Sequence, residues 1–224
     1  MQRIQNLRDA REAAGHSQLG VRFLYGPRES LNVPNGNVIL GINPGGEQDL
    51  SDRLWTAKTA YYSETWTSSD YQLFVRVFMQ SVFTFGGSSN WQLSWDRSVT
   101  SNLFPFRSRG VSDLSSAELS SFIKFGRGLW KDIFQEIRPR LIVTFGGPTR
   151  DAMLFIANQL CWSTELLRSY PANQRNTSAE LFAFSGPVGE GRMLLAPHYA
   201  HGHGARGADV LREMALDIAP FAAL

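Results

Sequence analysis

Short, almost wholly apolar stretches that alternate with helical stretches limit this chain to a narrow set of folds. The two clearest are residues 37–42 (Asn-Val-Ile-Leu-Gly-Ile) and 140–145 (Arg-Leu-Ile-Val-Thr-Phe). Neither alternates apolar and polar residues as a half-exposed strand does, so both faces of each strand are expected to be covered. Helices on both faces of the sheet satisfy this requirement. The sequence therefore predicts an α/β fold, a three-layer α/β/α arrangement with a short, mainly parallel central sheet.

The other expected elements continue the same alternation. Helices are predicted at residues 2–14, 71–83, 115–136, 149–160 and 207–218, with a candidate break in the third at Gly126 and Gly128. A further strand is predicted at 98–103 and a hairpin from 181–184 and 193–196, while 25–36 and 163–178 are expected to be loops. No repeat, low-complexity tract or linker is visible, so a single domain over residues 1–224 is expected.

Composition excludes several classes of protein. With 43% hydrophobic and 19% charged residues the chain is globular, and 224 residues bury enough surface to need no metal or disulfide. No run approaches the roughly 20 apolar residues that cross a bilayer, and residues 1–15 lack the apolar core of a signal peptide. We therefore expect a cytoplasmic monomer with no membrane partner. The single cysteine, Cys161, excludes a disulfide framework and is expected to be a small buried hydrophobe.

The basic residues are unusual in kind rather than in number. The net charge is only +2, but 3 of the 22 basic residues are lysines (Lys58, Lys124 and Lys131) and the rest are arginines. Guanidinium forks match phosphate oxygens, which suits nucleic-acid binding. A GC-rich genome would give the same bias without functional meaning, so both interpretations stay open.

Three polar loops follow strand candidates, after Ile42, after Leu103 and after Ala196. Ligands bind beyond the carboxyl ends of the strands in such sheets, so these loops are expected to share one site. The first, Gly41-Ile-Asn-Pro-Gly-Gly46, lacks the Lys-Ser/Thr of a P-loop and the spacing of a dinucleotide motif. The second, residues 100–109, carries an asparagine at the end of an apolar strand and two arginines suited to phosphate.

The third loop contains three of the four histidines, His198, His201 and His203, within Leu-Leu-Ala-Pro-His-Tyr-Ala-His-Gly-His-Gly-Ala-Arg. Their spacing, H-x-x-H-x-H, is one that metal ligands can have. No cysteine lies nearby and no H-E-x-x-H signature is present. We favour a metal-free role in DNA contact or catalysis, with neither metal nor cofactor expected.

Taken together, these loops resemble the uracil-DNA glycosylase superfamily over roughly residues 38–206. Gly41–Gly45 resembles the first motif of the mismatch-specific uracil/thymine branch, and its G-x-N-P-G pattern is shared with the single-strand-selective monofunctional branch. Ser101–Pro105 resembles the N-x-C-P segment of that second branch, and Arg140–Gly146 resembles a later core strand. His198 stands where the family has the histidine or asparagine of its second motif.

The second motif departs from the family pattern. The family has H-P-S-P or N-P-S, whereas this chain has Ala-Pro-His-Tyr-Ala-His from residue 196. Aligning His198 with the motif histidine places Tyr199 where proline is usual, and aligning Pro197 with the motif proline leaves Ala196 in the catalytic place. His201 is the second choice for the motif histidine. The single cysteine excludes the iron–sulfur branches.

The resemblance implies a monofunctional DNA glycosylase whose partner is DNA containing a target base. By resemblance, Asn43 would position the attacking water, Asn102 would hydrogen-bond the flipped base, and His198 would stabilise negative charge on the leaving base. The base pocket would also include Gly41, Ile42, Pro44 and Gly45, with Tyr61 or Tyr62 as the stacking aromatic. DNA contacts would come from Arg107, Arg109, Tyr199, His201, His203 and Arg206.

The excised base stays open at this stage. Uracil is the family default, but an asparagine amide can pair with uracil or, flipped, with cytosine. Gly45 and Gly46 leave room for substituents at the pyrimidine 5-position, and residues 46–70 carry Trp55, Tyr61, Tyr62 and Trp66. These aromatics are either core packing or space for a larger base, such as hypermodified cytosine of phage DNA. The role would then be antiviral defence instead of DNA repair.

Two other classes of function compete with the glycosylase interpretation. A non-catalytic nucleic-acid or base-binding module of the same fold is favoured by the atypical second motif. A metallohydrolase built on the histidine cluster is the third class.

Overall fold

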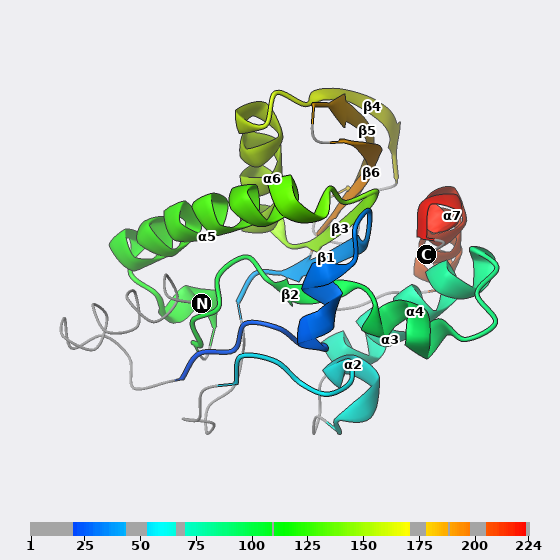
Figure 1. The fold of residues 1–224 in the computed structure, drawn as a ribbon, viewed down its shortest axis with the longest axis horizontal. Coiled ribbons are helices and arrows are strands. Elements are labelled where there is room, and N and C mark those ends of the chain that lie inside the picture. Colours follow the sequence, from blue (N-terminus) through cyan, green and yellow to red (C-terminus); the bar gives the residue numbers. More distant parts are fainter. Residues whose placement is uncertain are drawn as a thin grey trace.

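A six-stranded mixed sheet forms the centre of the computed structural model (Figure 1), which describes residues 20–43, 53–65, 70–108, 110–170, 178–187, 189–197 and 205–222. The strands are β1 (Asn37–Gly41), β2 (Val99–Asn102), β3 (Leu141–Phe145), β4 (Ser163–Ser169), β5 (Glu180–Gly186) and β6 (Gly189–Ala196). Their order is β2-β1-β3-β6-β5-β4. The first three pairings along this order are parallel and the last two are antiparallel.

Helices cover both faces of the sheet, which confirms the three-layer α/β/α prediction. They are α2 (Ala60–Ser63), α3 (Asp70–Phe85), α4 (Trp91–Asp96), α5 (Ser116–Ile137), α6 (Gly147–Gln159) and α7 (Ala205–Ala222), with 3₁₀ turns η1 (Arg28–Asn32) and η2 (Val111–Asp113). Buried residues of α5 and α6 share one hydrophobic cluster, and those of α2, α3, α4 and α7 share the other. No helix in the described ranges is long and apolar enough to span a membrane.

Strand β1 shows why its sequence carries no polar alternation. Val38 and Leu40 belong to the cluster under α5 and α6, whereas Ile39 between them belongs to the cluster under α3 and α7. All five residues of β1 are buried, as are all five of β3. A strand buried on both faces must be apolar at successive positions, so the prediction from the sequence is confirmed.

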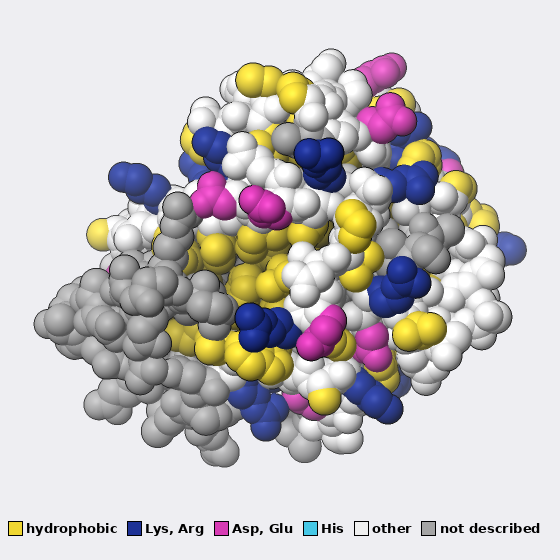
Figure 2. Space-filling view, in the orientation of Figure 1, with side chains coloured by type: hydrophobic (Ala, Val, Ile, Leu, Met, Phe, Trp, Pro, Cys, Tyr) yellow, Lys and Arg dark blue, Asp and Glu magenta, His cyan; other side chains and the backbone are white. Residues whose placement is uncertain are grey.

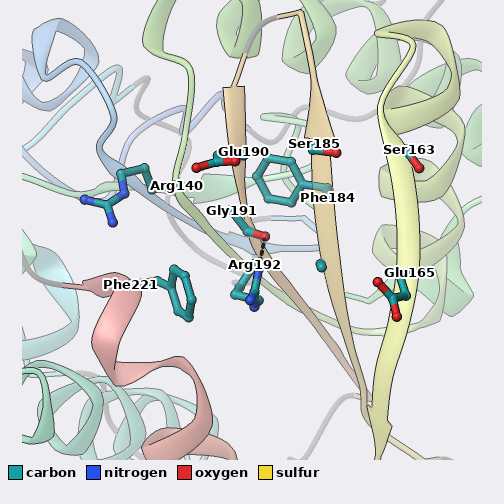
Figure 3. Close-up of a pocket in the computed structure, with 10 residues that line it drawn as sticks. Arg140, Ser163, Glu165, Phe184, Ser185, Glu190, Gly191, Arg192 and Phe221 are labelled. Atoms are coloured by element: carbon teal, nitrogen blue, oxygen red, sulfur yellow. Dashed lines mark hydrogen bonds between the residues drawn. The ribbon is translucent and has the colours of Figure 1, made fainter.

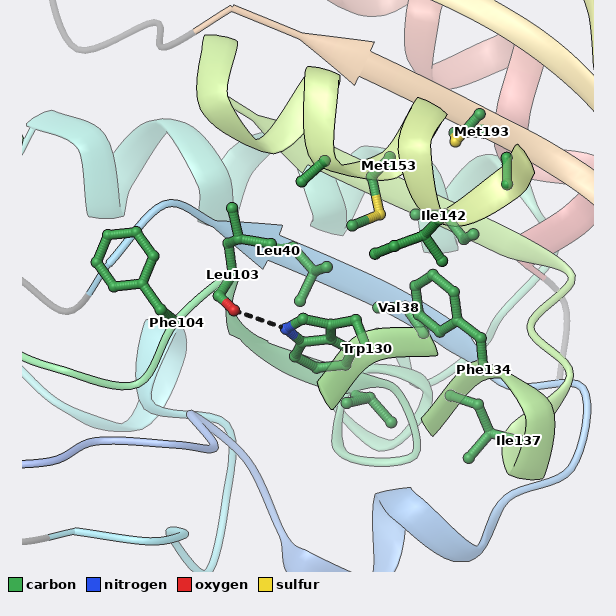
Figure 4. Close-up of a cluster of buried hydrophobic side chains, with 14 of the residues drawn as sticks. Val38, Leu40, Leu103, Phe104, Trp130, Phe134, Ile137, Ile142, Met153 and Met193 are labelled. Atoms are coloured by element: carbon green, nitrogen blue, oxygen red, sulfur yellow. Dashed lines mark hydrogen bonds between the residues drawn. The ribbon is translucent and has the colours of Figure 1, made fainter. Parts of the chain in front are cut away.

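Helix α5 packs closely on the end of β2 (Figure 4), and this contact explains the first of its two glycines. A Cβ atom on Gly126 would lie 2.3 Å from the carbonyl oxygen of Leu103. The side chain of Trp130, one turn further along the helix, is fully buried and donates from Nε1 to the carbonyls of Asn102 and Leu103, both at 3.1 Å. The expected break at Gly126 and Gly128 is therefore wrong: α5 is continuous, and Gly126 allows a close approach.

Other expectations from the sequence also differ from the structure. Residues 163–169 form β4 instead of a loop, because they pair with β5 although all seven are exposed. The hairpin is confirmed and is longer than expected, and 3₁₀ turn η1 lies within the loop predicted at 25–36. Cys161 is exposed, with a positive φ of 56°, so the expectation of a buried thiol is wrong. The helix predicted at 2–14 lies outside the described residues.

An extended segment at residues 20–25 lies antiparallel to β2 and the chain that follows it. Leu24 is bridged to Ser101, and Val21 to Phe106. The Ser101 hydroxyl donates to the carbonyl of Phe23, and the backbone N–H of Tyr25 donates to Thr100 O at 2.8 Å. This segment covers the free edge of β2 and carries side chains toward both faces of the sheet.

Candidate functional site

The carboxyl ends of β1 and β2 bring together the first two loops that the sequence indicates. Gly41, the last residue of β1, is in register with Asn102, the last residue of β2. Asn43 follows β1 by two residues, and its amide lies within hydrogen-bonding distance of the chain that follows β2. The two asparagines expected to act on one substrate therefore extend from neighbouring strand ends.

The side chain of Asn102 lies over Gly41 and is only 4% exposed. A Cβ atom on Gly41 would lie 2.3 Å from Asn102 Oδ1 and 3.4 Å from the Tyr71 hydroxyl, so glycine is required for this packing. The amide nitrogen, Nδ2, is buried near the Tyr25 phenol and meets no partner with good hydrogen-bond geometry within the part of the chain that the structure describes. A buried polar atom without a partner is costly, and such atoms often mark ligand sites.

Asn43 is held by a chain of hydrogen bonds that joins the two loops. Its Nδ2 donates to the hydroxyl of Ser108 at 2.7 Å, and that hydroxyl donates to the carbonyl of Gly110 at 3.0 Å. Ser108 is itself buried. Because Nδ2 is the donor in this contact, the amide plane of Asn43 is fixed relative to the strand ends.

Three tyrosines lie on the α2–α3 side of Asn102: Tyr25 and Tyr61 are buried, and Tyr71 is partly buried. The ring of Tyr61 lies 5.6 Å from that of Tyr25 and 6.4 Å from that of Tyr71. The Tyr61 hydroxyl donates to the Tyr71 hydroxyl, and burial together with the neighbouring phenols raises the pKa of Tyr61 well above its usual 10.0. Burial raises the pKa values of Tyr71 and Tyr25 as well. All three phenols are therefore neutral hydrogen-bonding groups at physiological pH.

A network of paired charges lies next to Tyr25, one of these three tyrosines. Arg22 Nη2 donates to both carboxylate oxygens of Glu64 at 3.0 and 3.1 Å, and Arg53 donates to the same carboxylate at 3.0 Å. The guanidinium of Arg22 lies 4.1 Å from the centre of the Tyr25 ring. This charge opposes the rise in the Tyr25 pKa that burial causes, as do the nearby Asn102 amide and Arg107. The network fixes Tyr25 beside the end of β2.

The predicted aromatic and arginine residues have contacts that refine their expected roles. Tyr61 stacks on Trp95 at 5.8 Å, so one face of its ring is already occupied. Tyr62 points to α4, where its hydroxyl donates to Asp96 at 2.6 Å. Arg107 is 4% exposed and lies near Tyr25, an interior position for a residue expected to contact phosphate. These three roles stay predictions.

The side chain of Ile42 packs on the turn that follows β3. A Cβ atom on Gly146, which has a φ of 105°, would lie 2.5 Å from Ile42 Cδ1. The N–H of Gly146 donates to the carbonyl of Ala196 at 2.8 Å. The ends of β1, β3 and β6 therefore meet at the same edge as Asn102.

Several predicted site residues lie outside the described part of the chain. They are Pro44, Gly45, Arg109, His198, Tyr199, His201 and His203, together with the side chain of Arg206, whose backbone belongs to α7. Among the residues that the structure describes, no group of three or more His, Cys, Asp or Glu side chains is arranged to hold a metal ion. The histidine loop is not part of that set.

Four side chains at this edge are not among the residues that the sequence indicates: Arg22, Tyr25, Tyr71 and Ser108. Residues 20–25 form only isolated bridges, which leave no periodic pattern in the sequence. Tyr71 opens a predicted helix and gives no sign of facing Gly41. Ser108 lies between two arginines that the sequence indicates as phosphate ligands. Its contact with Asn43 becomes visible only in the fold.

A separate hollow of about 380 Å³ lies at the other end of the sheet (Figure 3). Arg140 precedes β3, and Glu190 and Arg192 lie at the start of β6, so this hollow is at the amino ends of these strands. Phe221 from the end of α7 borders it, and the Arg192 guanidinium lies 4.4 Å from the centre of that ring. It shares no residue with the asparagine site.

A scan against models of known protein families and a search of curated proteins both find no match for this sequence.

Proposed function

We propose that this protein is a monofunctional DNA glycosylase, which flips a pyrimidine out of DNA and hydrolyses its N-glycosidic bond to leave an abasic site. The observation that carries the proposal is the buried amide of Asn102. It lies over a required glycine, and its Nδ2 meets no partner with good hydrogen-bond geometry in the described ranges. An amide in this position supplies the donor and acceptor that a pyrimidine edge needs once the base has left the stack.

In this proposal Asn43 positions the water that attacks the sugar. Its Nδ2 donates a hydrogen bond to Ser108, so its side-chain carbonyl oxygen is the atom that would accept a hydrogen bond from water. The water oxygen adds to C1′ while the C1′–N bond breaks, and the bonding electron pair leaves with the base. The water loses a proton to solvent and the base nitrogen takes one up. A neutral amide suffices to orient the water, because the sugar is already strongly electrophilic.

Negative charge on the leaving base is the second requirement of the chemistry. Hydrogen-bond donors in a dry pocket stabilise such charge without a metal. Asn102 Nδ2 is one donor, and by resemblance His198 or His201 is another, although both histidines lie outside the described residues. The neutral Tyr71 phenol lies close to the same strand end.

The contacts of residues 53–65 favour a small base over a sugar-decorated one. Tyr61 is buried and stacks on Trp95, and the ring of Tyr62 packs against Trp91 and Trp95, so neither ring is placed to stack on a sugar. Trp55 lines a hollow on the other side of segment 20–25. We therefore propose uracil or a pyrimidine with a small 5-substituent as the target, in a repair or an antiviral role.

The test is base release from DNA carrying uracil, a thymine mismatch, 5-hydroxymethyluracil or glucosylated hydroxymethylcytosine, scored by alkali cleavage at abasic sites. Asn43→Ala should lower the rate by at least about a hundredfold, since one positioned group commonly contributes that much. Asn158→Ala, an exposed asparagine on α6, is the matched control and should leave the rate unchanged.

Release that is lost in Asn43→Ala and kept in Asn158→Ala supports the proposal. The absence of abasic product from every substrate, with DNA binding retained, would overturn it in favour of a base-binding module. Activity that disappears in chelator would point instead to a metallohydrolase. Release of the glucosylated base alone would contradict the preference for a small base.

A further inference from the structure

A second hollow, of about 440 Å³, lies on the outer side of segment 20–25. Figure 2 shows hydrophobic side chains gathered in this hollow, with charged side chains at its rim. Its walls come from segment 20–25, 3₁₀ turn η1, residues 54–55 and α5. The lining residues are Phe23, Leu24, Arg28, Glu29, Leu31, Asn32, Leu54, Trp55, Leu129 and Ile133. Its volume is in the range of pockets that bind small organic groups.

The hollow and the asparagine site are neighbours that share one segment. Tyr25 belongs to the cluster beside Asn102, whereas Leu24 and Phe23, one and two residues earlier, line the hollow. The Phe23 ring also lies 6.1 Å from Trp130, whose Nε1 donates to the carbonyl of Asn102. The two places are therefore connected through one short segment, residues 20–25, which lies along the edge of β2.

The hollow presents an aromatic ring with one guanidinium, Arg28, and one carboxylate, Glu29, among its lining residues. Trp55 is 45% exposed, and the exposed guanidinium of Arg28 lies 5.4 Å from the centre of its ring. Arg53, two residues before Trp55, keeps 49% of its side chain exposed although it is paired with Glu64. The other walls are Phe23 and aliphatic side chains, and Glu29 and Asn32 add a carboxylate and an amide to the lining.

We propose that this hollow binds an unpaired base next to the target nucleotide in the same DNA strand, an inference that rests on the proposed glycosylase function. Every nucleobase has a face that stacks on an indole ring and on aliphatic side chains. Arg28, which lines the hollow beside Trp55, would meet a phosphate of the same strand. An exposed indole with a guanidinium beside it favours a nucleotide over an uncharged apolar ligand.

The experiment measures binding of two labelled single-stranded DNA probes by fluorescence anisotropy. The first is a 15-nucleotide strand with one central uracil, and the second has base-free tetrahydrofuran residues on both sides of that uracil. All variants carry Asn43→Ala, so that the DNA stays intact. Trp55→Ala should weaken binding of the first probe about tenfold and of the second hardly at all, because stacking needs a base.

Phe155→Ala is the matched control. Phe155 on α6 is 44% exposed and has the Arg127 guanidinium 4.4 Å from its ring centre, so it reproduces the exposure and the cation–π contact of Trp55. It should bind both probes as the parent does. Thermal unfolding of each variant identifies any that fails to fold, and Trp55→Phe, which keeps an aromatic face, should recover most of the binding.

The outcomes separate this proposal from the proposed function. Unchanged binding in Trp55→Ala, or an equal loss with both probes or with Phe155→Ala, overturns the base-binding hollow even if the parent chain releases uracil. A loss confined to Trp55→Ala and the first probe supports the hollow. That result would stand even if no base release were detected, in which case only the glycosylase proposal fails.

Discussion

The strands of the parallel half of the sheet are more deeply buried than the edge strand of the antiparallel half. Every residue of β1, β2 and β3 is buried, whereas every residue of the edge strand β4 is exposed. A strand end surrounded by packed helices can hold a polar side chain such as Asn102 in one position. A strand exposed along its whole length has no such control. The difference explains why the candidate site lies at the parallel half.

The largest effect should follow from removing the side chain that ties α5 to the parallel half. Trp130→Ala deletes a fully buried indole and leaves the carbonyls of Asn102 and Leu103 without their donor. Loss of about 4 kcal/mol in the free energy of unfolding is expected. Urea denaturation at pH 7 measures it, and a loss below about 1 kcal/mol would show that the parallel half does not depend on this contact.

A smaller effect should distinguish the two glycines of α5. Gly126→Ala would place a Cβ against the carbonyl of Leu103, and because backbone cannot easily move aside, a loss of about 2 kcal/mol is expected. Gly128→Ala meets no atom within 4 Å and should stabilise the helix by about 0.5–1 kcal/mol. Both are measured by urea denaturation. Equal effects of the two substitutions would contradict the close approach of α5 to β2.

Alkali should weaken the parallel half through its buried phenols. The pKa of Tyr61 is raised in the folded protein, so the unfolded chain releases this proton first. The protonated Tyr61 phenol contributes fully to the free energy of unfolding below pH 10, and this contribution is lost as the pH rises above 10. By pH 11 a phenol that stays protonated in the fold lowers stability by about 1.4 kcal/mol. Tyr61→Phe should show a shallower decline between pH 9 and pH 11 in thermal unfolding than the parent chain.

The smallest effect is expected at the edge of the antiparallel half. Leu166 on β4 is 50% exposed, so Leu166→Ala should change the free energy of unfolding by no more than about 0.5 kcal/mol. The same urea titration used for Trp130→Ala gives the comparison directly. A loss of 2 kcal/mol or more would mean that β4 is covered in solution by something outside the described residues.

Prediction from sequence worked best where burial left a strong pattern. The strands β1 and β3 and the helices α3, α5 and α6 follow from their apolar runs and from the glycines and prolines beside them. Strand β4, Ser-Thr-Glu-Leu-Leu-Arg-Ser, has no such pattern, because pairing with β5 holds it in the sheet and burial does not. Propensity alone is a weak guide for an exposed edge strand.

The sequence indicates the two asparagines of the candidate site, but it does not indicate the residues that hold them in position. Asn43 and Asn102 stand out as polar residues at the ends of apolar strands. Ser108 and Tyr25 act through contacts between segments far apart in the sequence, 65 residues in the case of Asn43 and Ser108. Contacts of that kind leave no local signal, so only the fold identifies the residues that orient a predicted group.

The amide of Gln72 has a consequence for how the molecule opens. Its Nε2 on α3 reaches the carbonyls of Ala60, Tyr61 and Glu64 at 3.4, 3.1 and 2.8 Å, so it caps the end of α2. A helix of only four residues cannot persist alone in water. The backbone amides of α2 and those at the start of α3 should therefore exchange with deuterium as one cooperative unit. Whenever that unit unfolds locally, Tyr61 should lose its contacts with Tyr25 and Tyr71.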